Sequence, residues 1–180
     1  MSEPVKSSKE LVLIGLLNPK SPTNVGGVMR AAGCYQADGV RYTGKRYALA
    51  ASHRGEQYNT DTKRVSRNIP LTGVECLLDD LDDDTQVICV DLIEGAIPLP
   101  EFRHPKKAIY LFGPEDGTLD QGLVDRADSV VYVPTVGCMN LASSVNVLLY
   151  DRLAKGRSHG SDELIRQSRD TNNRVKVKQA

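Results

Sequence analysis

The sequence has no apolar run that approaches the roughly 18 residues needed to cross a membrane. Its first residues lack the apolar stretch of a secretory signal, so we expect a cytoplasmic protein with no membrane partner. The four cysteines are scattered, without the paired spacing of metal ligands, and we expect reduced thiols and no metal. A Walker A pattern and a Gly-x-Gly-x-x-Gly fingerprint are also absent, which argues against the common nucleotide-binding classes.

The formal net charge is zero, which by itself indicates no particular partner. The charges are nevertheless unevenly placed: residues 75–101 contain acidic side chains and no Lys or Arg, whereas residues 41–67 and the segment after Arg152 are mainly basic. Such asymmetry is typical of a protein with one side that faces a polyanion. Solvated loops would give the same pattern, so charge alone leaves both interpretations open.

The apolar segments are short, continuous and separated by helical patterns. This arrangement favours an α/β fold with a mostly parallel sheet and helices on both faces. We expect strands at residues 11–16, 40–43, 69–74, 87–90, 108–112 and 130–133. We expect helices at residues 24–35, 75–81, 120–127 and 139–154. The last helix is the clearest, because its apolar residues recur close to every 3.6 positions.

Other stretches are expected to be less regular. Residues 1–10 would form an N-terminal extension before a domain that spans residues 11–157. Residues 44–67 show no clear periodicity and are expected to form a long basic loop. Residues 158–180 are polar and basic, and form either a mobile tail or a helix that a partner orders. The histidines are interpreted as surface residues: His53, His104 and His159.

Three segments rich in Gly, Asn and Pro each follow an expected strand: residues 24–30, 112–117 and 133–141. In an open α/β sheet, ligands bind beyond the carboxyl ends of the strands. We therefore expect these segments to form the candidate site.

The first segment combines two glycines at the start of a helix with an asparagine and an arginine. Glycines there let backbone N–H groups approach an anion closely. Arg30 follows Asn24 by six residues, nearly two helical turns, from where it could bind a phosphate on the same side as Asn24. Alternatively, Thr23 or Asn24 caps the helix and Arg30 forms a surface ion pair, and the spacing leaves both interpretations open.

The other two segments add a carboxylate and an amide. Gly113 suits close approach to a ligand, and Glu115 could accept hydrogen bonds from a ribose or from a cap, although a plain turn is equally compatible. Asn140 lies at the start of the last helix, where it could cap or hold a ligand. Cys138 at that position could have a lowered pKa, but no histidine lies in the three segments, which disfavours a nucleophilic thiol.

Taken together and in this order, the three segments resemble the motifs of the SpoU (TrmH-like) branch of the SPOUT superfamily of RNA methyltransferases. The first motif, Asn-x-Gly-x-x-x-Arg, is matched by Asn24, Gly26 and Arg30. The second, Phe-Gly-x-Glu-x-x-Gly-Leu, is followed by Phe112, Gly113, Pro114, Glu115 and Leu119, with the second glycine shifted by one position. The third is matched by Met139, Asn140 and Leu141, and by Tyr150 and Asp151.

The resemblance implies a SPOUT fold with a C-terminal trefoil knot, a homodimer, and 2′-O-methylation of a ribose in RNA with S-adenosylmethionine. The catalytic residues that it implies are Arg30, Asn24, Glu115 and Asn140. The residues that it places around the cofactor are Leu92, Gly113, Val133, Cys138, Met139 and Leu141. A guanidinium stays protonated, so we expect Arg30 to hold the target phosphate and stabilise the developing oxyanion rather than act as an unaided base.

Two positions depart from the family pattern: Cys138 stands where serine is frequent, and Ala142 where many members have a second serine. The size resembles the small tRNA methyltransferases that act around the anticodon loop, with a ribosomal RNA ribose as the alternative. A catalytically inactive RNA-binding protein of the same fold is the main rival. A dinucleotide-binding protein would need a fuller glycine fingerprint, and relatives that methylate base nitrogens have different motifs.

Overall fold

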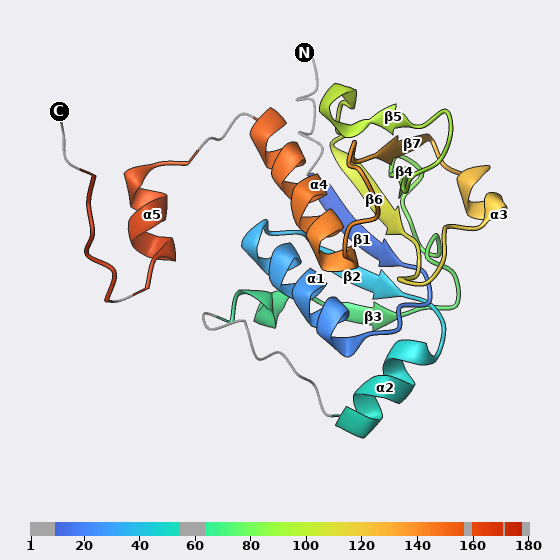
Figure 1. The fold of residues 1–180 in the computed structure, drawn as a ribbon, viewed down its shortest axis with the longest axis horizontal. Coiled ribbons are helices and arrows are strands. Elements are labelled where there is room, and N and C mark those ends of the chain that lie inside the picture. The colour runs from blue at the N-terminus through green and yellow to red at the C-terminus, as the bar shows by residue number, and fades with distance from the viewer. Residues whose placement is uncertain (1–9, 55–63, 157–159, 171, 178–180) are drawn as a thin grey trace, which may run out of the picture.

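The centre of the molecule is a parallel β-sheet. The computed structural model describes residues 10–54, 64–156, 160–170 and 172–177. Within them, seven strands pair in parallel in the order β3-β2-β1-β6-β4-β7-β5 (Figure 1). The strands are β1 Leu11–Leu16, β2 Gly39–Tyr42, β3 Leu71–Gly73, β4 Gln86–Val90, β5 Ile97–Pro98, β6 Lys107–Phe112 and β7 Ser129–Tyr132. The predicted α/β fold with a parallel sheet is confirmed.

Strands β1 and β6 lie side by side and set the position of the site. The last four residues of β1 and the last five of β6 are buried, as expected for parallel strands that are covered on both faces. Their register runs from Leu11 opposite Lys107 to Leu16 opposite Phe112. Both strands therefore end at the same edge of the sheet, and the segments that follow them begin next to each other.

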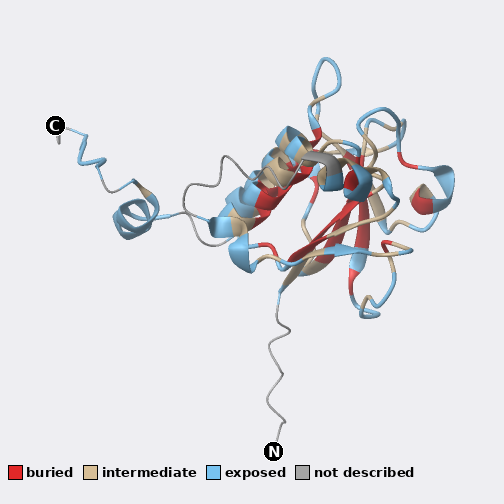
Figure 2. Ribbon diagram, turned by 90° about the horizontal axis from the view of Figure 1, so that it is seen from below, coloured by how far each residue is buried: buried red, intermediate tan, exposed pale blue. Residues whose placement is uncertain are grey.

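Two long helices cover one face of the sheet, α1 (Pro22–Cys34) and α4 (Leu141–Lys155), which lie side by side (Figure 1). Their apolar sides pack on the strands, with Val28 of α1 and Leu148 of α4 in one cluster with Ile14, Tyr110 and Phe112. Figure 2 shows the buried residues along the strands and on the helix sides that face them.

The opposite face is covered mostly by irregular chain. A one-turn helix, α3 (Gln121–Val124), contributes Leu123, and the segment of residues 74–81 contributes Leu77. These side chains pack on Cys89 and Ile109 of the sheet. Regular helices therefore cover only one face extensively, and the prediction of helices on both faces holds only in part.

Two predictions for the connections are wrong. The expected loop over residues 44–67 contains helix α2 (Arg46–Arg54) and the 3-10 helix η1 (Val65–Asn68), while residues 55–63 lie outside the described residues. The expected helix over residues 75–81 is a series of turns. There the Asp79 carboxylate accepts the backbone N–H of Cys76 at 3.2 Å and Asp80 has a φ of 53°. Aspartate side chains that bond nearby backbone groups compete with helix formation in this way.

The described part of the tail forms a short helix, α5 (Asp162–Ser168), which stands apart from the sheet in Figure 1. None of its residues is buried, and Leu164 and Ile165 are exposed. A second 3-10 helix, η2 (Leu99–Glu101), follows β5. The sequence patterns missed both η2 and the two-residue strand β5, because such short elements have no periodicity to detect.

The interpretation of His104 as a surface residue is wrong. Its side chain is only 5 % exposed, with Nδ1 2.7 Å from the Tyr110 hydroxyl and Nε2 2.8 Å from Oδ2 of Asp151. Burial outweighs the contact with Asp151 and lowers the pKa of His104, which favours the neutral ring. His104 therefore links β6 to the end of α4. The side chain of His53 and all of His159 lie outside the described residues.

No helix in the described part of the chain is long and apolar enough to span a membrane. The trefoil knot and the homodimer stay predictions.

Candidate functional site

The segments after β1 and β6 are joined by one carboxylate. Oε2 of Glu115 accepts the backbone N–H of Lys20 at 2.8 Å, and Oε1 accepts that of Ser21 at 3.0 Å. Oε1 also accepts the side-chain amide of Asn24 at 3.1 Å. Glu115 thus holds the start of α1 against the loop that follows β6, which a plain solvated turn would not do.

Asn24 extends this connection to the third segment. Its Oδ1 accepts Nδ2 of Asn140 at 2.9 Å. Oδ1 of Asn140 in turn accepts the backbone N–H groups of Ala142 at 2.9 Å and Ser143 at 3.3 Å, which caps α4. An ionised carboxylate can only accept, so Glu115 fixes the orientation of both amides along the chain. The structure therefore brings together three of the four predicted catalytic residues.

The ionised form of Glu115 is favoured by its contacts. Partial burial by itself raises the pKa of this carboxyl group. The hydrogen bonds from the backbone amides and from Asn24 outweigh burial, and the pKa lies below its ordinary value. The carboxylate is therefore charged near neutral pH and accepts all three hydrogen bonds.

Asn24 is available for this role because another residue caps α1. The prediction that Thr23 or Asn24 is the cap is wrong: the helix begins at Pro22, and the Ser21 hydroxyl accepts the backbone N–H of Asn24 at 3.3 Å. Proline suits the first helical position, since its fixed φ is already helical and it has no N–H to satisfy.

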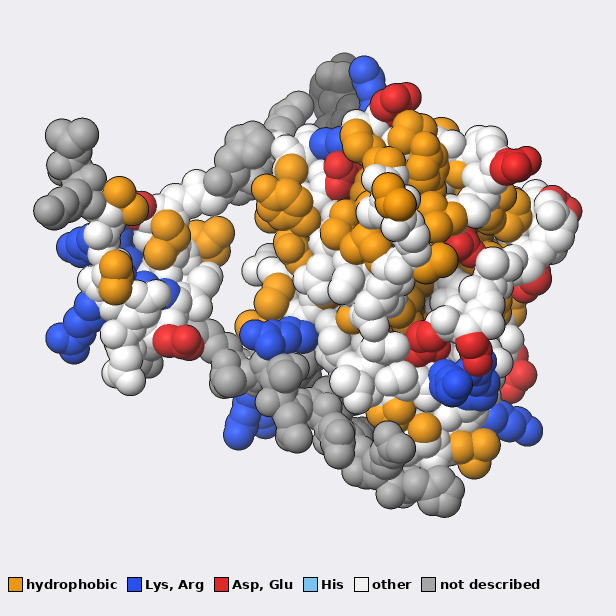
Figure 3. All heavy atoms as spheres, viewed as in Figure 1, with side chains coloured by type: hydrophobic (Ala, Val, Ile, Leu, Met, Phe, Trp, Pro, Cys, Tyr) orange, Lys and Arg blue, Asp and Glu red, His pale blue; other side chains and the backbone are white. Residues whose placement is uncertain are grey.

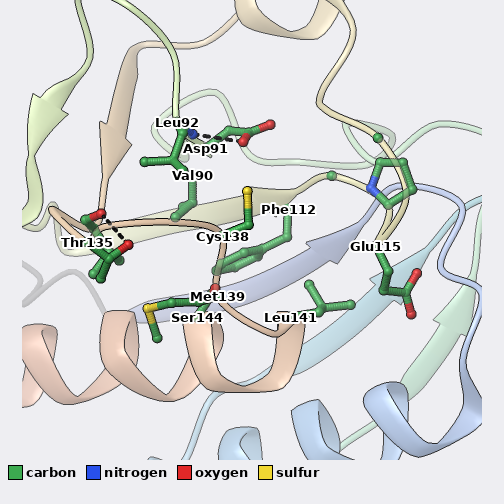
Figure 4. Close-up of a pocket in the computed structure, with 14 residues that line it drawn as sticks. Val90, Asp91, Leu92, Phe112, Glu115, Thr135, Cys138, Met139, Leu141 and Ser144 are labelled. Atoms are coloured by element: carbon green, nitrogen blue, oxygen red, sulfur yellow. Dashed lines mark hydrogen bonds between the residues drawn. The ribbon is translucent and has the colours of Figure 1, made fainter.

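A cavity of about 160 Å³ opens beside this connection, at the carboxyl ends of the strands (Figure 4). All six residues predicted to surround a cofactor line it: Leu92, Gly113, Val133, Cys138, Met139 and Leu141. Glu115 lines it as well. In Figure 4 the labelled side chains come from the ends of β4 and β6 and the segments that follow them, from the segment before α4 and from the first turn of α4. The strand-end rule therefore located one contiguous site.

Asp91 is a lining residue that the sequence patterns missed. Its two carboxylate oxygens accept the backbone N–H groups of Leu92 at 2.8 Å and Leu119 at 3.0 Å. Asp91 thus ties the end of β4 to the loop that follows β6, and both loops form walls of the cavity. The signal was present, because Asp91 directly follows the buried strand β4.

Arg30 is the predicted catalytic residue that the structure does not join to the others. Six residues along an α-helix turn it by about 600°, so Arg30 lies about 120° around α1 from Asn24 and about 9 Å further along. The Cα atoms of Asn24 and Arg30 therefore lie on different sides of α1, and the possibility that both side chains act on the same side stays a prediction. Arg30 is exposed, and within the described residues its guanidinium makes no hydrogen bond or ion pair.

A second set of charges lies at the margin of the site. Asp116, next to Glu115, accepts two hydrogen bonds from Arg46 at the start of α2, at 2.9 and 2.8 Å. Nζ of Lys20 lies 3.6 Å from the same carboxylate. No sequence pattern predicted this ion pair, since seventy positions separate Arg46 from Asp116.

Neither a metal site nor a disulfide is present in the described ranges. No group of three or more His, Cys, Asp or Glu side chains there could hold a metal ion. Cys138 is exposed at the cavity and the four cysteines are free.

Comparison with known proteins identifies the class. Residues 11–150 match the model of the SpoU rRNA Methylase family, and the chain belongs to that family. The resemblance of the three motifs is thereby confirmed. A search of curated proteins found no match.

Several solved structures share the fold of this chain at sequence identities of 16–22 %. An AdoMet-bound rRNA methyltransferase from Sinorhizobium meliloti is 20 % identical, with a TM-score of 0.67 over 83 % of this chain and 59 % of its own. A structure that concerns the 2-OH methylation of C/U34 on tRNA is 22 % identical, with a TM-score of 0.69. The match covers 83 % of this chain and 93 % of that one. The TrmH/SpoU tRNA modifying enzyme of A. aeolicus is 16 % identical, with a TM-score of 0.66. The match covers 82 % of this chain and 76 % of that enzyme.

Proposed function

We propose that this protein methylates the 2′-oxygen of a ribose in RNA, with S-adenosylmethionine as the methyl donor. The observation that carries the proposal is the connection from Glu115 through Asn24 to Asn140, which gathers three strand-end segments around one cavity. Membership of the SpoU family and the AdoMet-bound state of its structural neighbour support the choice of reaction and cofactor.

The cavity has the chemistry that S-adenosylmethionine requires. Apolar side chains such as Leu92, Val133 and Leu141 suit the adenine ring, while Thr135 and Ser144 offer hydroxyl groups to the polar parts of the molecule. A Cβ added to Gly113 would lie 3.0 Å from the backbone nitrogen of Leu119, so the loop after β6 packs closely on itself at this wall of the cavity. The bound cofactor supplies the methyl group that is transferred.

The residues of the chain position the ribose, whose 2′-hydroxyl releases its proton to water as its oxygen takes the methyl group. Glu115, Asn24 and Asn140 set the shape of the site through their mutual hydrogen bonds. Arg30 holds the phosphate beside the target ribose and stabilises the negative charge that develops on the attacking oxygen. Its exposed guanidinium, free of bonds to the described residues, is compatible with a ligand from outside its own chain.

The active form is a homodimer in which each subunit completes the site of the other. The outward side of α4 carries Asn146, Tyr150 and Leu153, and two of these are large apolar side chains exposed to 61 and 49 %. Figure 3 shows apolar side chains exposed over α4. A second subunit packed on this side of α4 would bring its own site for RNA and cofactor close to helix α1 and Arg30 of the first subunit.

The preferred substrate is a nucleotide of a tRNA anticodon loop, and a ribosomal RNA ribose is the alternative. The neighbour described by methylation of position 34 of tRNA is matched over 93 % of its length, which indicates a protein of similar size. The basic residues of the 41–67 segment and of the tail contact the RNA backbone, so affinity falls steeply as salt rises.

Replacing Arg30 by Ala tests the division of roles. We expect methyl transfer to fall by about a hundredfold or more, as when one stabilising donor is lost from an active site. Calorimetry should still detect S-adenosylmethionine, because the cavity residues are unchanged. Ribose-methylation mapping of total RNA from a deletion strain identifies the target. An Arg30→Ala variant that loses both S-adenosylmethionine binding and methyl transfer would contradict this division of roles. A wild type that binds RNA but not S-adenosylmethionine would favour an inactive RNA-binding protein.

A further inference from the structure

The ion pair between Asp116 and Arg46 joins three segments at the rim of the cavity. Asp116 belongs to the loop after β6, Arg46 begins α2, and Lys20 precedes α1. Arg46 makes a two-point contact, with Nη1 2.9 Å from Oδ1 and Nη2 2.8 Å from Oδ2. Figure 3 shows charged side chains of both signs gathered close to α2.

This ion pair is open to exchange with solvent anions. The side chains of Arg46, Asp116 and Lys20 are 32, 50 and 64 % exposed. Water and salt screen an exposed ion pair, so giving it up costs less than breaking a buried pair, even where the contact has two points. A phosphate offers a guanidinium the same two-oxygen geometry as a carboxylate does. Asp116 therefore occupies the position that a phosphate would take between Arg46 and Lys20.

The position of the pair relative to the cavity indicates which phosphate could bind. Glu115 and Gly117, on either side of Asp116, both line the cavity. The neighbouring carboxylate of Glu115 is already engaged by three N–H groups, so it does not compete for Arg46 as a hydrogen-bond acceptor. A phosphate held by Arg46 would thus belong to a polymer whose neighbouring unit lies at the cavity mouth.

We propose that Arg46 and Lys20 form a binding site for an RNA backbone phosphate, and that Asp116 occupies this site until RNA displaces it. The identity of the ligand as RNA rests on the proposed function. Asp116 then acts as a built-in competitor that weakens non-specific binding.

The test compares two single variants that break the same ion pair. The probe is a fluorescent twelve-nucleotide oligouridylate, titrated with full-length protein over a range of salt concentrations. We expect Arg46→Ala to weaken binding roughly fivefold, as for one lost surface charge contact, and to reduce the salt slope by about one. We expect Asp116→Asn to strengthen binding, because the competing anion is removed while the side chain keeps its size. Lys20→Ala should weaken binding like Arg46→Ala.

A matched control and a cofactor measurement separate the possible failures. Arg103→Ala removes the same charge just before β6, at the opposite edge of the sheet, and should change binding little. If the pair only braces α2, Arg46→Ala and Asp116→Asn will change binding in the same direction, or not at all, and the inference is overturned. Calorimetry of the wild type with S-adenosylmethionine reports on the proposed function separately, since none of these side chains needs to change for the cofactor to bind.

Discussion

At the scale of single residues, Glu115 shows how one carboxylate can hold separate segments of a site together. Its carboxylate accepts three hydrogen bonds from the chain that begins α1. Bonds to a charged acceptor stabilise a fold more than neutral ones, and their loss leaves donors unsatisfied. The role of Glu115 is therefore to position Asn24, and through it Asn140.

Replacing Glu115 by Gln should lower the free energy of unfolding at pH 7 by about 1–2 kcal/mol, because an amide cannot accept all three bonds. The folded-state pKa of Glu115 is depressed, so its stabilisation is present above the ordinary value of 4.5. It is lost as the pH falls through the lower folded-state pKa. Denaturant unfolding of the wild type and of Glu115→Gln at pH 7 and at pH 3 measures the difference in the free energy of unfolding.

The difference between wild type and Glu115→Gln should accordingly shrink in acid. Glu94→Gln serves as the control, since Glu94 is exposed and makes no hydrogen bond or ion pair within the described residues. A Glu115→Gln difference that stays constant between the two pH values would exclude a charged Glu115 as the source of the stabilisation.

At the scale of elements, the contact between α1 and α4 decides how closely Asn24 approaches Asn140. A Cβ added to Gly27 would lie 2.7 Å from the Cβ of Ala142, closer than real side chains allow. The two helices therefore touch almost backbone to backbone at this point. Ala142, which departs from the serine frequent in the family, fits here as a small residue facing glycine.

Gly27→Ala should destabilise the protein by about 1–3 kcal/mol through overpacking. The sign of the change in the free energy of unfolding is informative, because at an open helical position Gly→Ala stabilises by about 1 kcal/mol. Adding Ala142→Gly should recover much of the loss, since it removes the opposing Cβ. Thermal unfolding of the two single variants and the double variant forms the measurement, and additive effects would argue against the contact.

At the scale of the whole molecule, some features could be predicted from sequence and others could not. Continuous apolar strands and strand-end loops follow local rules, and these rules located the sheet and the cavity. The burial of His104 depends on Tyr110 and on Asp151, which is 47 positions away, so no local pattern indicates it. The side of α1 that Arg30 occupies follows from helix geometry, which a motif match alone does not consider.

The position of Arg30 leads to the last prediction, which concerns assembly. If Arg30 completes a neighbour's site, the exposed apolar side of α4 must be covered by a second copy of the chain. We expect the wild type to behave as a dimer in light scattering. Leu153→Asp should weaken the dimer about a hundredfold or more, because burying an unpaired carboxylate in an interface costs several kcal/mol.

The tail supplies a matched control for this change. Leu164 on α5 is exposed to 53 %, close to the 49 % of Leu153, but lies on the helix that stands apart from the sheet. Leu164→Asp should leave the dimer intact, whereas Leu153→Asp should give a folded monomer without methyl transfer. A wild type that stays monomeric at micromolar concentration would leave Arg30 without the neighbour that the proposed mechanism requires. A Leu153→Asp variant that remains a dimer would place the interface away from α4.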